Sequence, residues 1–351
     1  MTHAARVPAL LLVALVLALP AFAAAQATEG TFTHVVRDGE TLASIAQSYY
    51  GNPRRETVLV AENGLTAQGG APIRVGQRLT VPFVTYHEVQ AGETWPELAR
   101  RFYGDARRAF ALIEANGGSA SEQPDEGAEL LVPYPLRHVT TQGQNVVRVA
   151  SVYYPGGSRE DARRVRRFNN LRTMRLTRGQ IVLVPVASLT LTEEGRGAIA
   201  EATGVAPRAG EVRELQASID AELPELEEHV RRGRFPEAVA LGNRFLGSRQ
   251  LTGNQMVTVQ RQLATAFVAL GRNDLAVAAF LAALERQPDL ELDSLTTSPT
   301  VLAAFQRAQA QHEEATAAAE AAAAEEAAAA AAAEAEAAVE RPPPAASDGA
   351  P

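Results

Sequence analysis

Three histidines recur along the chain at almost equal spacing, and clustered histidines are a usual sign of a metal centre. His34, His87 and His138 lie 53 and 51 residues apart, whereas a bound zinc needs three or four ligands that converge on one point. Each histidine opens the same short phrase: HVVRDGETL, HEVQAGETW or HVTTQGQNV. Equivalent positions in repeated units lie far apart in space. The pattern therefore indicates three repeated units and no shared metal site.

The remaining residue types offer little for catalysis. The chain has no cysteine, which excludes a thiol nucleophile and disulfides. Outside the repeats and the N-terminal segment its histidines are His229 and His312, which lie on separate predicted helices. A glycan-cleaving enzyme needs a carboxylic acid of raised pKa in a cleft, and the acids of the second half follow a repeat-like helical pattern. We expect no enzyme and no cofactor, with a hydrolase of unrecognised type as an alternative.

Each repeated phrase begins a common order of elements. A short β-like run ends at a glycine that suits a tight turn, and a good helix N-cap follows two residues later. The glycines are Gly39, Gly92 and Gly143, and the caps are Thr41, Thr94 and Asn145. Apolar residues then recur at i, i+3, i+4 and i+7, which is one buried helical face. A helix is therefore predicted after each cap.

The second part of each unit is equally regular. Another short helix runs into an asparagine, and an alternating apolar strand then ends at a proline, which cannot continue a strand ladder. The asparagines are Asn63, Asn116 and Asn169, and the prolines are Pro82, Pro133 and Pro185. The predicted order is β-α-α-β, with both helices packed on a two-stranded antiparallel sheet.

These residues carry a family resemblance. The phrases H-x-V-x-x-G-E-T-L, I-A-x-x-Y-Y-G, E-N-G and V-G-Q-x-L-x-V-P together resemble the LysM module. The resemblance places modules at residues 33–83 and 86–134, and a divergent module at 137–186, where Gly143-Gln144-Asn145 replaces Gly-Glu-Thr. LysM modules bind glycans that contain N-acetylglucosamine, chiefly peptidoglycan and chitin. The resemblance implies the same ligand class for this chain.

The resemblance also implies where the glycan would bind. In the family the ligand lies between the loop after the first strand and the loop before the last strand, where main-chain groups can read an acetamido group at close range. The matching residues of the first module are Asp38, Gly39, Glu40, Thr41 and Leu42, opposite Asn63, Gly64 and Leu65. Those of the second are Gly92, Glu93, Thr94 and Trp95, opposite Asn116 and Gly117.

Several of these residues also have a purely structural interpretation. The glycines suit turns and the threonines suit helix caps whether or not a ligand binds. Trp95 takes the place of Leu42, the first buried position of a helix, so core packing is favoured over stacking on a sugar ring.

The second helix of the third unit is rich in arginine. The stretch REDARRVRRFNN contains Arg163, Arg164, Arg166 and Arg167. Glu160 and Asp161 can pair with Arg164, which favours a solvated helix face. The alternative is contact with an anionic envelope polymer or with a partner.

The second half of the chain resembles tetratricopeptide repeats. Residues at the intervals typical of that family are Leu263, Ala264, Phe267, Gly271, Ala276, Phe280, Ala283 and Pro288, with Gln260 in place of the first tryptophan. We expect a TPR-like helical domain over residues 190–310 that presents a surface to a protein partner. Either the segment Glu193–Thr203 or a helix that begins at Ser298-Pro299 caps the array. Residues 187–192 are expected to form a short strand.

The ends of the chain have distinct compositions. Residues 1–25 form a predicted signal peptide with an apolar run from Val7 to Leu19, which is shorter than a membrane span, so no span is expected after cleavage. Residues 311–340 form an Ala/Glu-rich helical spacer, and 341–351 a disordered proline-rich tail. The formal net charge of −8 disfavours nucleic-acid binding.

The sequence thus predicts an α+β part followed by an all-α part. We expect an exported, non-catalytic peptidoglycan-binding protein of the periplasm or cell envelope, which holds glycan strands through its LysM modules and a protein partner through residues 190–310. An alternative is an envelope structural or assembly adaptor whose modules bind protein in place of glycan.

Overall fold

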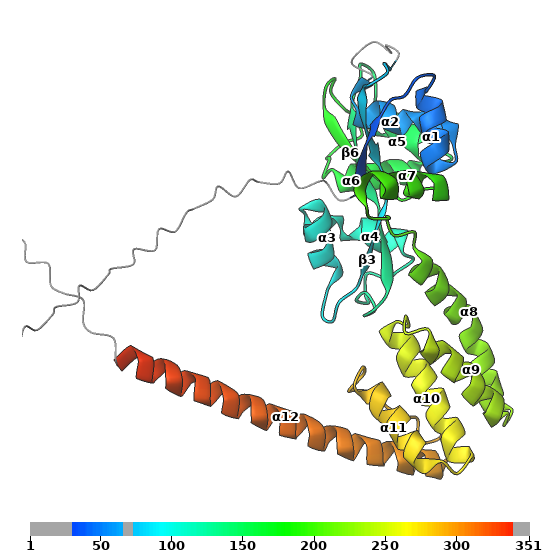
Figure 1. Ribbon diagram of the computed structural model, residues 1–351, viewed down its shortest axis with the longest axis vertical. Coiled ribbons are helices and arrows are strands. Elements are labelled where there is room, and N and C mark those ends of the chain that lie inside the picture. Colours follow the sequence, from blue (N-terminus) through cyan, green and yellow to red (C-terminus); the bar gives the residue numbers. More distant parts are fainter. Residues whose placement is uncertain (1–29, 66–72, 340–351) are drawn as a thin grey trace, which may run out of the picture.

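The computed structural model describes residues 30–65 and 73–339. The predicted signal peptide (1–25) and proline-rich tail (341–351) lie outside these residues. Three β-α-α-β units come first, which we call unit 1 (residues 30–83), unit 2 (84–133) and unit 3 (134–186), and the rest of the chain is helical (Figure 1). A mixed α/β start and a mostly helical remainder agree with the predicted fold class.

The three units share one topology. Unit 1 contains β1 (Thr31–Val35), α1 (Leu42–Tyr50), the 3-10 turn η1 (Pro53–Arg55), α2 (Glu56–Glu62) and β2 (Arg78–Pro82). Unit 2 contains β3 (Thr85–Glu88), α3 (Trp95–Tyr103), η3 (Ala106–Arg108), α4 (Ala109–Ala115) and β4 (Glu129–Val132). Unit 3 contains β5 (Tyr134–Val139), α5 (Val146–Tyr153), α6 (Arg159–Phe168) and β6 (Ile181–Val186). In each unit the first and last strands pair antiparallel into a two-stranded sheet.

The first helix of each unit begins where the sequence predicts. The side chains of Thr41, Thr94 and Asn145 each accept a hydrogen bond from the main-chain N–H three residues later, which satisfies one free donor at the helix start. Gly51 and Gly104 end α1 and α3 in the left-handed conformation, as helix-terminating glycines do. The predicted caps are confirmed.

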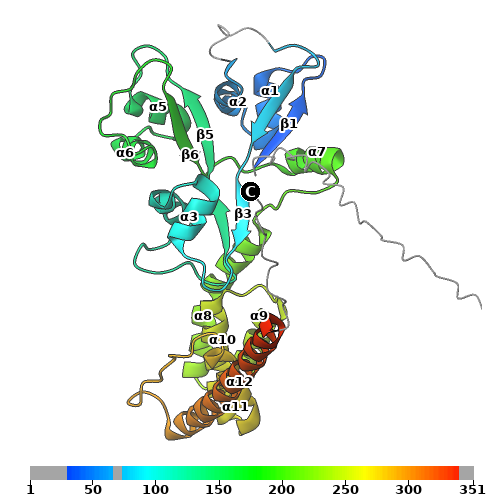
Figure 2. The same cartoon turned by 90° about the vertical axis from the view of Figure 1, so that its left-hand side faces the viewer.

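The three units share apolar cores. Phe168 at the end of α6 is fully buried in the core of unit 2, where its ring centroid lies 5.2 Å from that of Tyr103 and 6.3 Å from that of Phe110. Val58 of α2 in unit 1 belongs in the same way to the core of unit 3. Figure 2 shows the three units gathered around the region where their strands end. A unit of about 50 residues buries only a modest core alone, so these shared contacts join the units into one body.

The segment after unit 3 differs from the prediction. Residues 187–192 form no strand, so the strand expected there is wrong. Thr192 instead caps α7 (Glu193–Thr203), and its N–H donates to the carbonyl of Tyr49 at the end of α1 (2.9 Å). Ile199 of α7 is buried in the core of unit 1. Helix α7 therefore covers unit 1 and does not cap the helical array.

The helical half consists of two helix pairs and one long helix. The pairs are α8 (Glu211–Arg231) with α9 (Phe235–Gly247), and α10 (Gly253–Ala269) with α11 (Asn273–Leu284). Ala264 and Ala276 are fully buried between α10 and α11, beside Phe280. Small side chains at these positions let the helices approach closely, as the sequence predicts.

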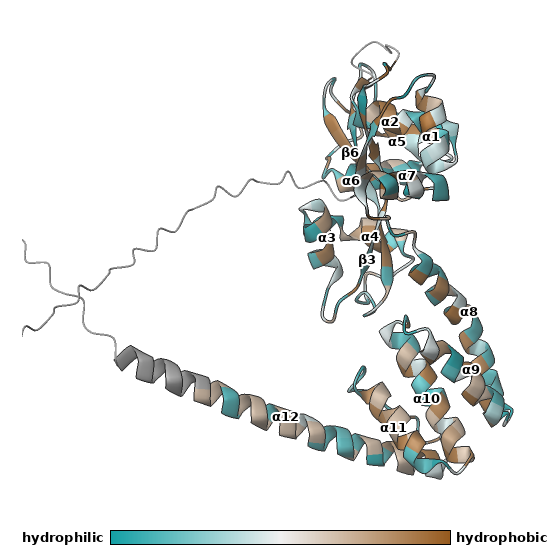
Figure 3. Ribbon diagram, in the orientation of Figure 1, coloured by the Kyte–Doolittle hydropathy of each residue, from teal (hydrophilic) through white to brown (hydrophobic). Residues whose placement is uncertain are grey.

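Helix α12 (Pro299–Val339) closes the array and then leaves it (Figure 1). Val301, Phe305 and Ala308 are buried against α10 and α11, so this helix provides the predicted cap. Residues 313–329 are exposed throughout, and in Figure 3 that part shows no continuous apolar stripe. No helix among the residues described here is long and apolar enough to cross a membrane.

A buried polar network fixes the helical half to unit 2. Gln216 of α8 is 5% exposed, and its side-chain oxygen accepts from the N–H of Glu129 (3.0 Å) at the start of β4. Its side-chain nitrogen donates to the carbonyls of Gly127 (2.8 Å) and Gln250 (3.0 Å). The carboxylate of Glu129 accepts in return from the N–H of Arg213. One glutamine thus connects unit 2, α8 and the loop before α10.

We expect Gln216→Met to keep the volume of the side chain but to leave the buried N–H of Glu129 and the part-buried carbonyls of Gly127 and Gln250 without this partner. The free energy of unfolding should fall by about 2–4 kcal/mol, because each buried unpaired group costs about 1–3 kcal/mol. Chemical denaturation measures this change. Gln306→Met on the exposed face of α12 is the matched control. Equal stability of the two variants would contradict the role given to Gln216.

Candidate functional site

A histidine–carboxylate pair braces the loop after the first strand in units 1 and 2. His34 Nε2 lies 2.8 Å from Glu40 Oε2, which also accepts from the N–H of Arg37 (2.7 Å). In unit 2, His87 Nε2 lies 2.6 Å from Glu93 Oε2, and the N–H of Gln90 donates to the same oxygen (2.9 Å). The predicted glycan-contact residues Glu40 and Glu93 therefore hold their own loop in shape.

Unit 3 keeps this brace without a charge. His138 Nε2 lies 2.9 Å from Gln144 Oε1, and the N–H of Thr141 donates to that amide oxygen (2.8 Å). The replacement of Gly-Glu-Thr by Gly-Gln-Asn thus preserves an acceptor at the same position, so the loop of unit 3 has the same support as the other two.

In units 1 and 3 a tyrosine hydroxyl contacts the other nitrogen of the imidazole ring. His34 Nδ1 lies 3.1 Å from the hydroxyl of Tyr49, and His138 Nδ1 lies 2.8 Å from that of Tyr153. Burial raises the pKa of Tyr49 to about 12, so the phenol keeps its proton and can donate it to Nδ1 in a hydrogen bond. Nε2 then carries the imidazole proton and donates to Glu40. Unit 2 has Phe102 here, which packs edge-on against His87.

The carboxylates of the brace favour their charged form. Burial by itself raises the pKa of Glu40, but hydrogen bonds from the Arg37 N–H and from His34 outweigh it, and the net pKa is lowered. The pKa of Glu93 is lowered in the same way, with burial opposed by the Gln90 N–H and by His87. Both loops are therefore braced by an anion at neutral pH.

The predicted asparagines bind the last strand of their own unit. The amide nitrogen of Asn63 donates to the carbonyls of Leu59 and Thr80 (2.9 Å each), and its oxygen accepts from the Thr80 N–H (2.7 Å). Asn116 makes the same three bonds to Leu112 and Leu131, and Asn169 makes them to Val165 and Leu183. The side-chain amides of these asparagines are occupied by main-chain groups, so they support the predicted groove by holding its second loop to the last strand.

Apolar side chains bring the two sides of the predicted groove together. Leu65 is 4% exposed and shares a core with the half-buried Leu42, which joins the two loops of unit 1. In unit 2, Trp95 is 5% exposed, and its indole N–H donates to the carbonyl of Glu122 (2.9 Å) on the opposite loop. A side chain at Gly118 would lie 3.1 Å from the indole. Trp95 therefore packs as a core residue between the loops.

What remains exposed at the predicted groove is mostly main chain. Gly39 (φ 78°) and Gly64 (φ 64°) in unit 1 are exposed, as are Gly92 (φ 78°) and Gly117 (φ 65°) in unit 2. A Cβ at any of the four would meet no atom within 4 Å. Asp38 is the exposed side chain beside them, and Thr41 and Thr94 are occupied as caps. The loops can thus offer backbone donors and acceptors to a ligand that comes close.

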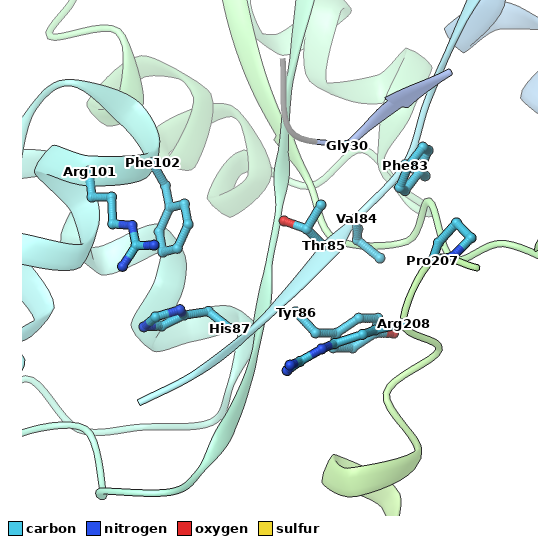
Figure 4. A pocket seen from close by; sticks show the side chains of 10 residues that line it. All are labelled: Gly30, Phe83, Val84, Thr85, Tyr86, His87, Arg101, Phe102, Pro207 and Arg208. Carbon is cyan, nitrogen blue, oxygen red and sulfur yellow. The ribbon is translucent and has the colours of Figure 1, made fainter. Parts of the chain in front are cut away.

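A second hollow lies between units 1 and 2. The cavity has a volume of about 310 Å³. Figure 4 shows His87, Arg101 and Phe102 on one side of it and Tyr86, Pro207 and Arg208 on the other. Arg101 lies 3.5 Å from Glu93, and Arg208 lies 3.7 Å from the buried Glu129. Both cations have carboxylate partners. The cavity borders the first predicted glycan loop of unit 2, because His87 and Arg101 both contact Glu93.

One repeated contact escaped the sequence analysis. Each unit has a Tyr-Tyr or Phe-Tyr pair at the end of its first helix. The hydroxyl of the second residue in the pair donates to the carbonyl of the proline that ends the last strand. The pairs are Tyr50 with Pro82 (2.7 Å), Tyr103 with Pro133 (3.1 Å) and Tyr154 with Pro185 (2.7 Å). The three-fold recurrence of both residues at fixed spacing could have suggested this contact.

Comparison with known proteins identifies one module directly. Residues 34–82 match the family profile described as LysM domain. Two relatives from strains of Mycobacterium tuberculosis, named Esterase MT1326 and Esterase Rv1288, are each 32% identical to this chain over 126 residues. The aligned part is 36% of this chain and 27% of each relative, so the chain spans about a quarter of their length. No solved structure matches significantly.

We expect Asn63→Ala to lower the free energy of unfolding by about 2–3 kcal/mol, because it removes three hydrogen bonds and leaves both main-chain groups of Thr80 without a partner. Chemical denaturation measures the loss. Asn254→Ala is the control, since Asn254 is exposed and its side chain makes no hydrogen bond among the described residues. An Asn63 variant as stable as this control would show that the amide contacts contribute nothing.

The lowered pKa values of Glu40 and Glu93 predict acid sensitivity. Their stabilisation is fully present above the pKa of an unfolded glutamate and is lost as pH falls through the lower folded pKa. Glu40→Gln with Glu93→Gln should therefore lose less unfolding free energy than the parent between about pH 6 and about pH 3. Denaturation across that range measures it. Glu56→Gln with Glu88→Gln, at exposed positions of the same units, is the control and should follow the parent.

Proposed function

We propose that this chain is an exported, non-catalytic protein that binds N-acetylglucosamine-containing glycan, in particular peptidoglycan, through tandem LysM modules. The observation that carries the proposal is the LysM match over residues 34–82. Unit 2 supports its extension, because it repeats the histidine–glutamate brace, the asparagine contacts and the tyrosine–proline contact of unit 1. Unit 3 is proposed as a divergent third module, since Gln144 replaces the carboxylate.

The geometry of the loops supports a role in reading an acetamido group. Gly39 and Gly64 keep side chains away from the exposed backbone on the two sides of the groove in unit 1, and Gly92 and Gly117 do so in unit 2. An acetamido group offers one N–H and one carbonyl, which such exposed main-chain groups can pair with. The braces and the asparagine contacts hold both loops in place before a ligand arrives, which reduces the ordering cost of binding.

The fixed arrangement of the units supports binding to long glycans. Each module is expected to bind weakly, and modules on one body can raise the overall affinity by about 10²- to 10⁴-fold if one polymer spans them. The shared cores of the three units keep the spacing of their loops constant. A glycan strand with regularly repeated sugars is a ligand that can use such spacing.

The helical half is proposed as a TPR-like surface for a protein partner. A cavity of about 360 Å³ lies between Phe235 of α9, Val268 of α10, Asn273 of α11 and Val301 of α12. Its apolar wall suits a side chain from a bound segment. Gln216 keeps this half attached to the glycan-binding units. The chain would then connect a partner to the wall.

We further propose that the chain itself does not hydrolyse esters, although the relatives it partly matches are named esterases. A serine nucleophile needs a histidine base within hydrogen-bond reach. In the described part of the chain no serine hydroxyl bonds a histidine ring, and His34, His87 and His138 are engaged by the loop braces. The proposal that the protein is exported rests on the predicted signal peptide at residues 1–25.

Substitution of two loop glycines should separate binding from folding. We expect Gly39→Asn with Gly92→Asn to weaken binding to N-acetylglucosamine oligomers by about tenfold or more, because a side chain then blocks close approach to the main chain. Asparagine tolerates the left-handed conformation better than other residues, which limits strain. Calorimetric titration with chitin oligomers and sedimentation with purified peptidoglycan measure the effect.

Gly51→Asn with Gly104→Asn provides the matched control. These glycines have similar positive φ values, 67° and 70°, but lie at the far ends of α1 and α3. The control should bind like the parent. Absence of binding by the parent itself would favour the adaptor whose modules bind protein. Release of acetate from an acetylated substrate would contradict the non-catalytic assignment.

A further inference from the structure

Unit 3 carries an unusual charge for this protein. Between residues 134 and 186 there are ten arginines and only two acidic residues, Glu160 and Asp161, which gives a formal charge of +8. The whole chain has a formal charge of −8. Positive charge is thus concentrated on the module whose loop departs most from the Gly-Glu-Thr pattern. The electric field of such a charged surface attracts anionic ligands and raises their local concentration.

The arginines of α6 face a groove between two units. A hollow of about 440 Å³ lies between α4 of unit 2, through Phe110 and Glu114, and α6 of unit 3, through Arg163, Arg164, Arg166 and Arg167. The groove exists only because α6 packs against unit 2, where Phe168 enters the core. Its walls therefore come from two rigid helices whose spacing is fixed.

Two of these arginines hold the walls of the groove together. Arg164 Nε donates to Glu114 (2.6 Å) across the groove, and its terminal nitrogen donates to Asp161 (2.9 Å) on its own helix. The guanidinium carbon of Arg167 lies 4.1 Å from the ring centroid of Phe110. A cation on an aromatic face is held in place but keeps its charge and most of its donors.

Three of the four groove arginines have no carboxylate partner within the described part of the chain. Among residues 30–65 and 73–339, no carboxylate lies within ion-pair distance of Arg163, Arg166 or Arg167. Glu160 lines the same groove and pairs with none of them. The Nε of Arg166 is buried without a hydrogen-bond partner, which is uncommon for a buried donor. Like charges three and four residues apart also destabilise a helix. An anion in the groove would offset the unpaired positive charges and the repulsion between them.

We infer that this groove binds a polyanionic glycan, a polymer with phosphate or carboxylate groups along its chain. Arginine donates two parallel hydrogen bonds to either group, and the groove is large enough for a sugar with its acid substituent. Single-stranded nucleic acid usually needs an open aromatic face, but Phe110 is 5% exposed and covered by Arg167. This site is separate from the glycine loops proposed to read acetamido groups.

The test compares two triple variants of the full chain. Arg163→Gln with Arg166→Gln and Arg167→Gln removes the groove cations, and Arg172→Gln with Arg175→Gln and Arg178→Gln removes the same charge from an exposed loop of unit 3. The probes are inorganic polyphosphate, polygalacturonate and, for comparison, vesicles with anionic lipid. We expect the groove variant to bind the polyanions at least about tenfold more weakly than the loop variant.

The outcomes separate this site from the other proposals. Binding to only one of the two polymers identifies phosphate or carboxylate as the recognised group. Equal weakening in both variants, no binding by the parent, or binding to vesicles alone would overturn the inference. Chitin-oligomer binding should be unchanged in the groove variant, so failure of the glycine-loop proposal is detected separately. If the groove variant does not fold, the same binding measurements are made with the single variant Arg163→Gln, and Arg172→Gln serves as its control.

Discussion

In each unit the last strand has one edge that no other strand among the described residues covers, and a single asparagine side chain makes the hydrogen bonds that a third strand would make. The amides of Asn63, Asn116 and Asn169 each bind both main-chain groups of one residue on that edge. Unpaired edge groups cost stability and invite pairing with other chains. A two-stranded sheet alone is barely stable. The asparagine ties the second helix to the sheet, and the loops beside it depend on that tie.

The same constraint explains why the three units pack together. A sheet of two strands with two short helices leaves apolar surface that its own residues cannot cover. Val58 of unit 1 completes the core of unit 3, and Phe168 of unit 3 completes the core of unit 2. The arrangement creates surfaces that no unit has alone, among them the arginine groove between α4 and α6. Gln216 extends the body to the helical half.

The two proposed sites assign different ligand chemistry to different units of this body. The glycine loops of units 1 and 2 expose main-chain groups and suit a neutral acetamido group. Unit 3 carries concentrated arginine charge and suits an acidic polymer. Both kinds of group can occur on envelope glycans, so the three units could contact different parts of one surface polymer.

The sequence by itself determined the local elements and the LysM resemblance of the first unit, because caps such as Thr41, stops such as Gly51 and the apolar periodicity act within a few residues. It also indicated that Trp95 packs in the core. It did not reveal that Glu40 braces a loop with His34, nor that Asn63 binds Thr80, because those contacts join residues whose side chains could equally face solvent or ligand. The position of α7 on unit 1 and the groove beside Arg166 were decided by tertiary packing. The hydrophobic effect is not directional and does not depend on separation along the sequence. Which surface covers each apolar face is therefore decided only when the whole molecule folds.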